Sequence, residues 1–260
     1  MMQSVALPDI NNLINHYFWP LTRTLALFMT APVFSEKAAL KKVKIGLAVL
    51  IAFLIGQNLP ENDIALMSVT GLWVTIKEVM IGAAIGLTVQ FIFAAMRFAG
   101  EVIGMQMGLS FAAFYDPSGN QSMAVLSRIL NVIFTLLFLS LNGHLYLIKI
   151  LADSYSLLPI SAASVSNSGF YQLAGAAGII FSSGLKIGMP VITLLLTLNL
   201  TLGLLNRLTP QLSIFVIGFP ISITLGMGSL LLVMYNFPPI FQDLMNNIFV
   251  TVNSILAGFR

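Results

Sequence analysis

Long apolar runs, separated by short polar connectors, make up most of this 260-residue chain. A helix needs about 20 mainly apolar residues to cross the hydrocarbon core of a bilayer, which is about 30 Å thick. The pattern therefore predicts an all-α membrane protein, with helical segments over residues 13–34, 45–59, 64–96, 123–152, 171–206, 212–237 and 240–259.

Several of these runs do not fit a simple membrane crossing. Residues 45–59 would form roughly 22 Å of helix, which is too short to cross unaided. Residues 64–96 and 171–206 are too long for one crossing, and charged residues interrupt them. Ionisable residues at membrane depth normally face protein, a cavity or a partner. The pattern favours long, kinked helical hairpins packed against other proteins, and six untidy spans are the alternative. The charged residues inside apolar runs are Arg23, Lys77, Glu78, Arg128 and Lys186.

The composition excludes most other classes of protein. Of the residues, 58% are hydrophobic and 8% charged, with a mean hydropathy of +0.95, whereas soluble domains carry about 25% charged residues. The net charge of +3 shows no clustering that would indicate a nucleic-acid partner. The chain has no cysteine and two histidines, and it lacks phosphate-loop, zinc-protease and nucleophile-elbow motifs. We therefore predict one membrane domain over residues 1–260, with no enzyme activity, cofactor or metal.

A basic patch lies between the first two runs. By the positive-inside rule this loop should be cytoplasmic, and the next connector, residues 60–63, is acidic and has no lysine or arginine. The patch is either a topology signal alone or also a docking site for a cytoplasmic partner. Its residues are Lys37, Lys41, Lys42 and Lys44.

Pairs of glycines four residues apart indicate close helix packing, because they let another backbone approach. The pairs are Gly82/Gly86, Gly100/Gly104, Gly104/Gly108 and Gly184/Gly188. Beside the central stripe, Arg97 and Glu101 are four apart and can pair along one helix face. These features serve either packing within the chain or contact with a neighbouring subunit.

A second candidate contact lies where a long apolar run is broken by Asn206, Arg207, Pro210 and Gln211. Pro210 removes a backbone donor and disfavours helix at Thr209. The break is either an inter-subunit contact or a helix-ending turn. Glu78, beside Lys77, is either a proton relay or a structural salt bridge across an interface. The predicted subunit-interface residues are thus Glu78, Arg97, Gly100, Glu101, Gly104, Asn206, Arg207, Pro210 and Gln211.

The most informative stretch runs from Gly100 to Leu130. Asp116-Pro117 and Ser118-Gly119 are turn formers. The residues before them are rich in methionine and phenylalanine, which is unusual for a surface loop. Flexible, polarizable methionine fills irregular gaps, so the segment either plugs a channel or forms a hairpin with a buried apolar arm. The candidate plug residues are Met105, Gln106, Met107, Gly108, Leu109, Ser110, Phe111, Phe114, Tyr115, Asp116 and Pro117.

The segment GEVIGMQMGLSFAAFYDPSGN resembles one found in the FliR family of flagellar export-gate proteins. Further matches follow in order along the chain, from about Tyr17 to Gly226, and the last 34 residues resemble the family only in hydrophobicity. They are YFWPLTRTLALFMTAPVFSEKAALKKVKIGLA, KEVMIGAAIGLTVQFIFAAMRFAGE, FLSLNGHLYLI and MPVITLLLTLNLTLGLLNRLTPQLSIFVIGFPISITLG.

The resemblance implies a subunit of the flagellar type III secretion export gate in the bacterial inner membrane, at the flagellar basal body. One copy would assemble with several copies of FliP and FliQ into a helical, conical complex of hairpins, with FlhB and FlhA nearby. Unfolded rod, hook and filament subunits would pass through its centre. Residues 105–120 would plug the pore, with the Gly and Met residues at its start lining the constriction. Partner subunits, together with membrane lipid, would cover the untidy hairpins.

Two rivals to this interpretation remain open. The equivalent subunit of a virulence injectisome is close, although the NRLTPQLSIF and NGHLYLI segments look more flagellar. A secondary transporter with Gly- or Pro-broken helices would show an internal repeat between its halves, and none is evident by eye. An enzyme acting on lipid lacks a convergent Ser/His/Asp set.

Overall fold

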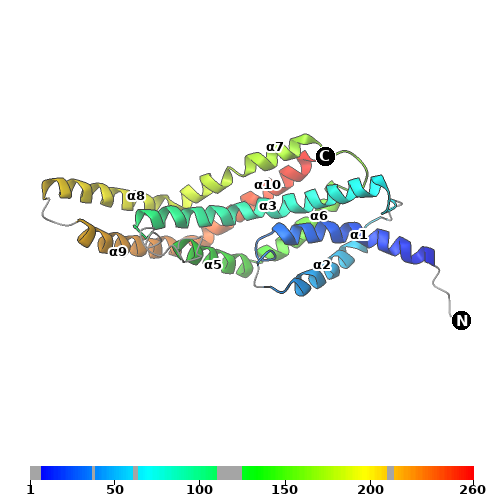
Figure 1. The fold of residues 1–260 in the computed structure, drawn as a ribbon, viewed down its shortest axis with the longest axis horizontal. Helices are drawn as coiled ribbons and strands as arrows, with labels where there is room; N and C mark the ends of the chain where they lie inside the picture. Colours follow the sequence, from blue (N-terminus) through cyan, green and yellow to red (C-terminus); the bar gives the residue numbers. More distant parts are fainter. Residues whose placement is uncertain (1–6, 37–38, 61–63, 110–124, 210–213) are drawn as a thin grey trace. The chain divides into compact units, whose positions relative to one another are not determined.

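The computed structural model describes residues 7–36, 39–60, 64–109, 125–209 and 214–260. Within these ranges the regular structure is helical and no strand is present, which confirms the all-α prediction (Figure 1). The helices are α1 (Leu7–Thr30), α2 (Lys41–Gly56), α3 (Val69–Gln106), α5 (Val125–Ser140), α6 (Gly143–Leu157), α7 (Asn167–Ala176), α8 (Ile179–Leu208), α9 (Ile214–Tyr235) and α10 (Phe237–Gly258).

The helix lengths confirm a membrane protein whose spans are irregular. Among the described residues, three stretches are long and apolar enough to cross a bilayer: Val69–Gln106, Asn167–Leu208 and Ile217–Tyr235. A fourth crossing results if α5 and α6 together form one broken span. The 16 residues of α2 give only about 24 Å of helix, as the apolar run predicted.

The apolar run over residues 123–152 does not form one helix. It breaks between α5 and α6 at Asn142, whose φ of 57° lies in the left-handed region. Asparagine tolerates this conformation better than most residues, and Gly143 follows it as the first residue of α6. The run over 64–96, in contrast, forms a single helix, which begins later than predicted, at Val69, and continues to Gln106.

The chain forms two compact units. Unit 1 comprises Met1–Gln90, Asn142–Ala177 and Ile248–Arg260, and unit 2 comprises Phe91–Leu141 and Gly178–Asn247. Two helices, α3 and α10, contribute residues to both units.

Contacts of residues near the start and near the end of the sequence stabilise unit 1. Near the start, the rings of Tyr17 on α1 and Phe53 on α2 stack with centroids 5.2 Å apart. Near the end, the amide of Ser166 donates to the carbonyl of Phe259 over 3.1 Å, and the buried Phe259 ring packs against Phe170 of α7. The C-terminal end of α10 is therefore part of this fold.

Unit 2 is built on aromatic packing. Phe93 of α3 lies edge-to-face against Phe134 and Phe138 of α5, with centroids 4.8 and 5.4 Å apart. Phe134 also contacts Phe241 of α10 at 4.7 Å. Such edge-to-face pairs add about 0.5–1.5 kcal/mol each beyond their buried area. These three helices thus share one apolar core.

Candidate functional site

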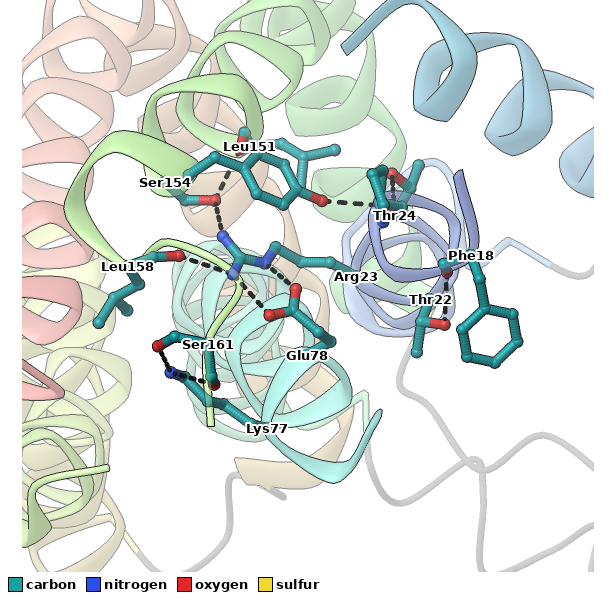
Figure 2. A network of polar contacts seen from close by, with 12 residues as sticks. Phe18, Thr22, Arg23, Thr24, Lys77, Glu78, Leu151, Ser154, Leu158 and Ser161 are labelled. Carbon is teal, nitrogen blue, oxygen red and sulfur yellow. Dashed lines mark hydrogen bonds and ion pairs between the residues drawn. The ribbon is translucent and has the colours of Figure 1, made fainter. Parts of the chain in front are cut away.

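A buried ion pair lies inside unit 1, between α1 and α3. Arg23 and Glu78 are both fully buried. The Arg23 Nε donates to Oε2 of Glu78 over 2.6 Å, and its Nη2 donates to Oε1 over 3.0 Å (Figure 2). This paired geometry neutralises both charges where water is excluded.

The remaining donors of Arg23 bind α6 and the residue after it. Its Nη1 donates to the Ser154 hydroxyl over 2.8 Å, and its Nη2 also donates to the Leu158 carbonyl over 2.9 Å. The guanidinium carbon lies 3.9 Å from the ring centroid of Tyr155. Arg23 thereby joins three helices of unit 1, because it lies on α1 and its polar contacts come from α3 and from the end of α6.

Lys77 extends this cluster in another direction. Its side chain is nearly buried, and its Nζ donates to the carbonyl and hydroxyl oxygens of Ser161 over 3.2 and 3.3 Å (Figure 2). Adjacent residues on a helix point about 100° apart, so Lys77 and Glu78 bind different segments. Of the two interpretations of Glu78, the geometry favours the structural salt bridge, formed within the chain. Its burial lends no support to Glu78 as a subunit-interface residue.

The second site is the C-terminal end of α3 in unit 2, where the candidate plug begins. The amide of Gly108 donates to the carbonyl of Met105, and the amide of Leu109 donates to that of Gly104, both over 3.0 Å. Gly108 has a φ of 80°. These two bonds around a left-handed glycine make a Schellman motif, which ends the helix at a defined residue.

Neighbouring helices hold this end of α3 in place, so residues 105–109 form an anchor for the segment that follows. Asn199 of α8 donates to the backbone carbonyl of Gln106 over 3.2 Å and to its Oε1 over 3.3 Å. The side chain of Met107 is only 1% exposed and lies directly against Gly226 of α9. Met105, in contrast, is 57% exposed.

We predict that substitutions at Gly108 follow the cost of a left-handed backbone. Gly108→Ala should lower the free energy of unfolding by about 1–2 kcal/mol. Gly108→Asn should cost less, because asparagine tolerates positive φ. Thermal unfolding of the full-length chain in mild detergent measures both. The matched control is Gly203→Ala on α8, where an added Cβ meets no atom within 4 Å. Equal losses for the alanine and asparagine variants at position 108 would contradict this role.

The predicted interface residues lie in different environments. Gly100 is buried, and an added Cβ there would meet the backbone of Ser127 on α5, at 2.6 Å from its Cα. The Nη1 of Arg97 on α3 donates to the Asn131 side chain on α5 over 3.2 Å. Gly104 is buried and Glu101 is half-buried. The packing of Gly100 thus serves the interior of the chain.

The helix break near residue 209 is confirmed. α8 ends at Leu208, and Thr209 leaves the helical conformation with a φ of −131° and a ψ of 76°. Asn206 and Arg207 are exposed on the last turn. The described ranges do not include Ser110, Phe111, Phe114, Tyr115, Asp116, Pro117, Pro210, Gln211 or Lys37.

One side of α8 carries polar residues among its exposed apolar ones. Ser182, Lys186, Thr193, Thr197 and Thr201 fall on one side of the helix by their spacing, and all five are exposed. The hydroxyl groups of the serine and the three threonines donate to backbone carbonyls four residues earlier. Lys186 has no such local way to hide its charge, so its position is unsuited to contact with lipid at the centre of a bilayer.

The comparisons with known proteins cover nearly the whole chain. The model of bacterial export proteins, family 1, matches residues 14–248. The flagellar biosynthetic protein FliR of Pectobacterium carotovorum is 50% identical over 249 residues, 96% of this chain and 95% of that protein. The chain belongs to the FliR family. FliR of Escherichia coli K12 is 49% identical over 244 residues, 94% of each chain, and FliR of Bacillus subtilis 168 is 25% identical over 238 residues, 90% and 92%.

The FliR-family match corrects the sequence interpretation at one end. The family model continues to residue 248, so the pattern does not stop at Gly226. The residues that sequence reasoning missed are Ser154, Tyr155, Asn199 and Gly226. Asn199 carried a usable signal, because an amide inside an apolar run needs a hydrogen-bonding partner. Gly226 had no such signal, since its role depends on which helix packs against it.

Proposed function

We propose that this chain is a structural and gating subunit of the flagellar type III protein export channel. Its plug would be the segment that begins at the anchor, residues 105–109. The observation that carries the proposal is the end of α3, where the Gly108 cap, the Asn199 bond and the burial of Met107 hold the base of that segment. A plug needs such a fixed base, because it must return to the same place after each opening. Met105, exposed at this base, is the best candidate for the constriction itself.

The partners that we propose are FliP and FliQ, with one copy of this chain in each complex. FlhB and FlhA would lie nearby, in the inner membrane at the flagellar basal body, and unfolded flagellar subunits would be the substrates. The position of Lys186 on α8 supports an assembly, because its charge is better accommodated by a partner or by water than by lipid. The names of the relatives favour a flagellar over an injectisome subunit.

The chemistry of the segment suits a gate that passes chains of any sequence. Residues 105–115 include two methionines, two phenylalanines and a tyrosine. A narrow hydrophobic constriction excludes water and ions. Flexible methionine side chains repack around varied partners without selecting one of them. The role is structural rather than catalytic.

The test replaces residues 110–118 with a Gly/Ser linker of equal length and keeps Gly108 and Leu109. We expect cells that carry this variant to become leaky to ions, measured with a membrane-potential dye. The control replaces residues 61–63 with Gly/Ser and should leave the potential unchanged. If the plug variant accumulates and assembles normally and the potential stays intact, the gating role is wrong.

A further inference from the structure

Helix α2 exposes an apolar surface that the other described residues of the chain do not cover. Its buried residues, Ala48, Ile51, Ala52 and Gly56, form one narrow stripe. Large apolar side chains occupy the other sides: Leu47, Val49, Leu50 and Leu54 are between 39% and 57% exposed. A continuous exposed apolar surface of this kind is typical of contact with lipid or with a partner.

The charges of α2 gather in its first turn. Lys41 and Lys42 are exposed, and Lys44 donates to the backbone carbonyl of Glu36. This turn has no acidic residue, and the N-cap residue, Leu40, makes no side-chain hydrogen bond to it. The positive end of the helix dipole adds to the lysine charges, so the first turn is a strongly positive end on an otherwise apolar helix.

We propose that the first turn of α2 binds the headgroups of anionic phospholipids, with the apolar face of the helix in the acyl region below them. The uncharged part, residues 45–56, is about 18 Å long, more than one leaflet but less than the whole hydrocarbon core. Lysine side chains at such a boundary extend their charged ends to the phosphates while their stems stay in the apolar layer. The inference rests on the membrane location of the chain and not on its gating role.

The distribution of charge favours lipid over an acidic protein partner. Polar and apolar groups are separated along the axis of α2, with the lysines at one end and apolar side chains on several sides beyond them. A bilayer has this layered order, with phosphates above a uniform apolar region. A protein partner would typically need acidic groups at one level and a shaped apolar groove below them. The positive end also matches the negative surface of a leaflet that holds anionic lipid.

The test places a photo-crosslinking amino acid at Val43, which is 60% exposed in the same turn. The full-length chain is crosslinked in membranes of cells that build the whole flagellar apparatus, and mass spectrometry identifies the adducts. We expect phospholipid adducts enriched in phosphatidylglycerol and cardiolipin over phosphatidylethanolamine. Each lysine should contribute about a fivefold preference, so the variant K41Q/K42Q/K44Q, which removes three, should lower the anionic enrichment about a hundredfold.

Two controls separate charge from general damage. K41R/K42R/K44R keeps the charges and should keep the enrichment. K149Q neutralises an exposed lysine elsewhere and should leave it unchanged. A protein adduct at position 43, or equal lipid composition for wild type and K41Q/K42Q/K44Q, would overturn the proposal. Membrane leakiness is read separately, so failure of the plug test leaves this result standing.

Discussion

Glu78→Leu alone should lower the free energy of unfolding of the chain by about 3–5 kcal/mol. The carboxylate takes two hydrogen bonds from Arg23, and both side chains are fully buried. Removing it leaves an unpaired guanidinium where water is excluded, which is the costliest outcome for a buried pair. Thermal unfolding in mild detergent and the amount of chain retained in the membrane measure the loss.

The double variant Arg23→Leu/Glu78→Leu is the matched control. Apolar pairs of similar volume often replace buried ion pairs with little loss, so the double variant should recover most of the stability. A small loss should remain, because the Leu158 carbonyl and the Ser154 hydroxyl lose the donor that they share. If the double variant is as unstable as Glu78→Leu, the pairing does not explain the effect.

The sequence predicted that these charges face protein but not which partner each one has. Arg23 inside an apolar run was a clear signal, since ionisable residues at membrane depth need a partner. Their positions are 55 residues apart, and helical periodicity does not say which helices are neighbours. Lys77, next to Glu78 in the sequence, was the more visible neighbour, but it donates to Ser161.

For the candidate plug as well, the sequence revealed the type of residue but not the contacts that each residue makes. Its composition, with methionine and phenylalanine before a turn, was evident from the chain alone. That composition did not show that the Gly and Met residues at the start of the segment have different surroundings within the chain. Met107 is buried against Gly226, Gly108 ends the helix and Met105 is exposed. These differences depend on packing with α8 and α9, which are far away in the sequence.

Gly82→Ala should destabilise the chain, and Gly46→Ala should not, although both glycines are inside helices. An added Cβ at Gly82 would lie 2.9 Å from the Cβ of Ala26 on α1 and press on the Arg23 carbonyl. Crowding a packed interface costs about 1–3 kcal/mol. At Gly46 an added Cβ meets nothing within 4 Å, so alanine should stabilise α2 by roughly 0.5–1 kcal/mol. Thermal unfolding midpoints should move in opposite directions.

The position of Gly82 connects this prediction to the ion pair. Glu78, Gly82 and Gly86 are four residues apart along α3, so they share one face, and Gly86 lies against the backbone of Leu27 on α1. The glycines let the two backbones approach closely enough for Arg23 to reach Glu78. Pushing α1 away at Gly82 should therefore weaken the ion pair as well. The double variant Gly82→Ala/Glu78→Leu should lose less stability than the sum of the two single losses, because each substitution removes part of the same contact. Fully additive losses would mean that the glycines and the ion pair stabilise α1 independently.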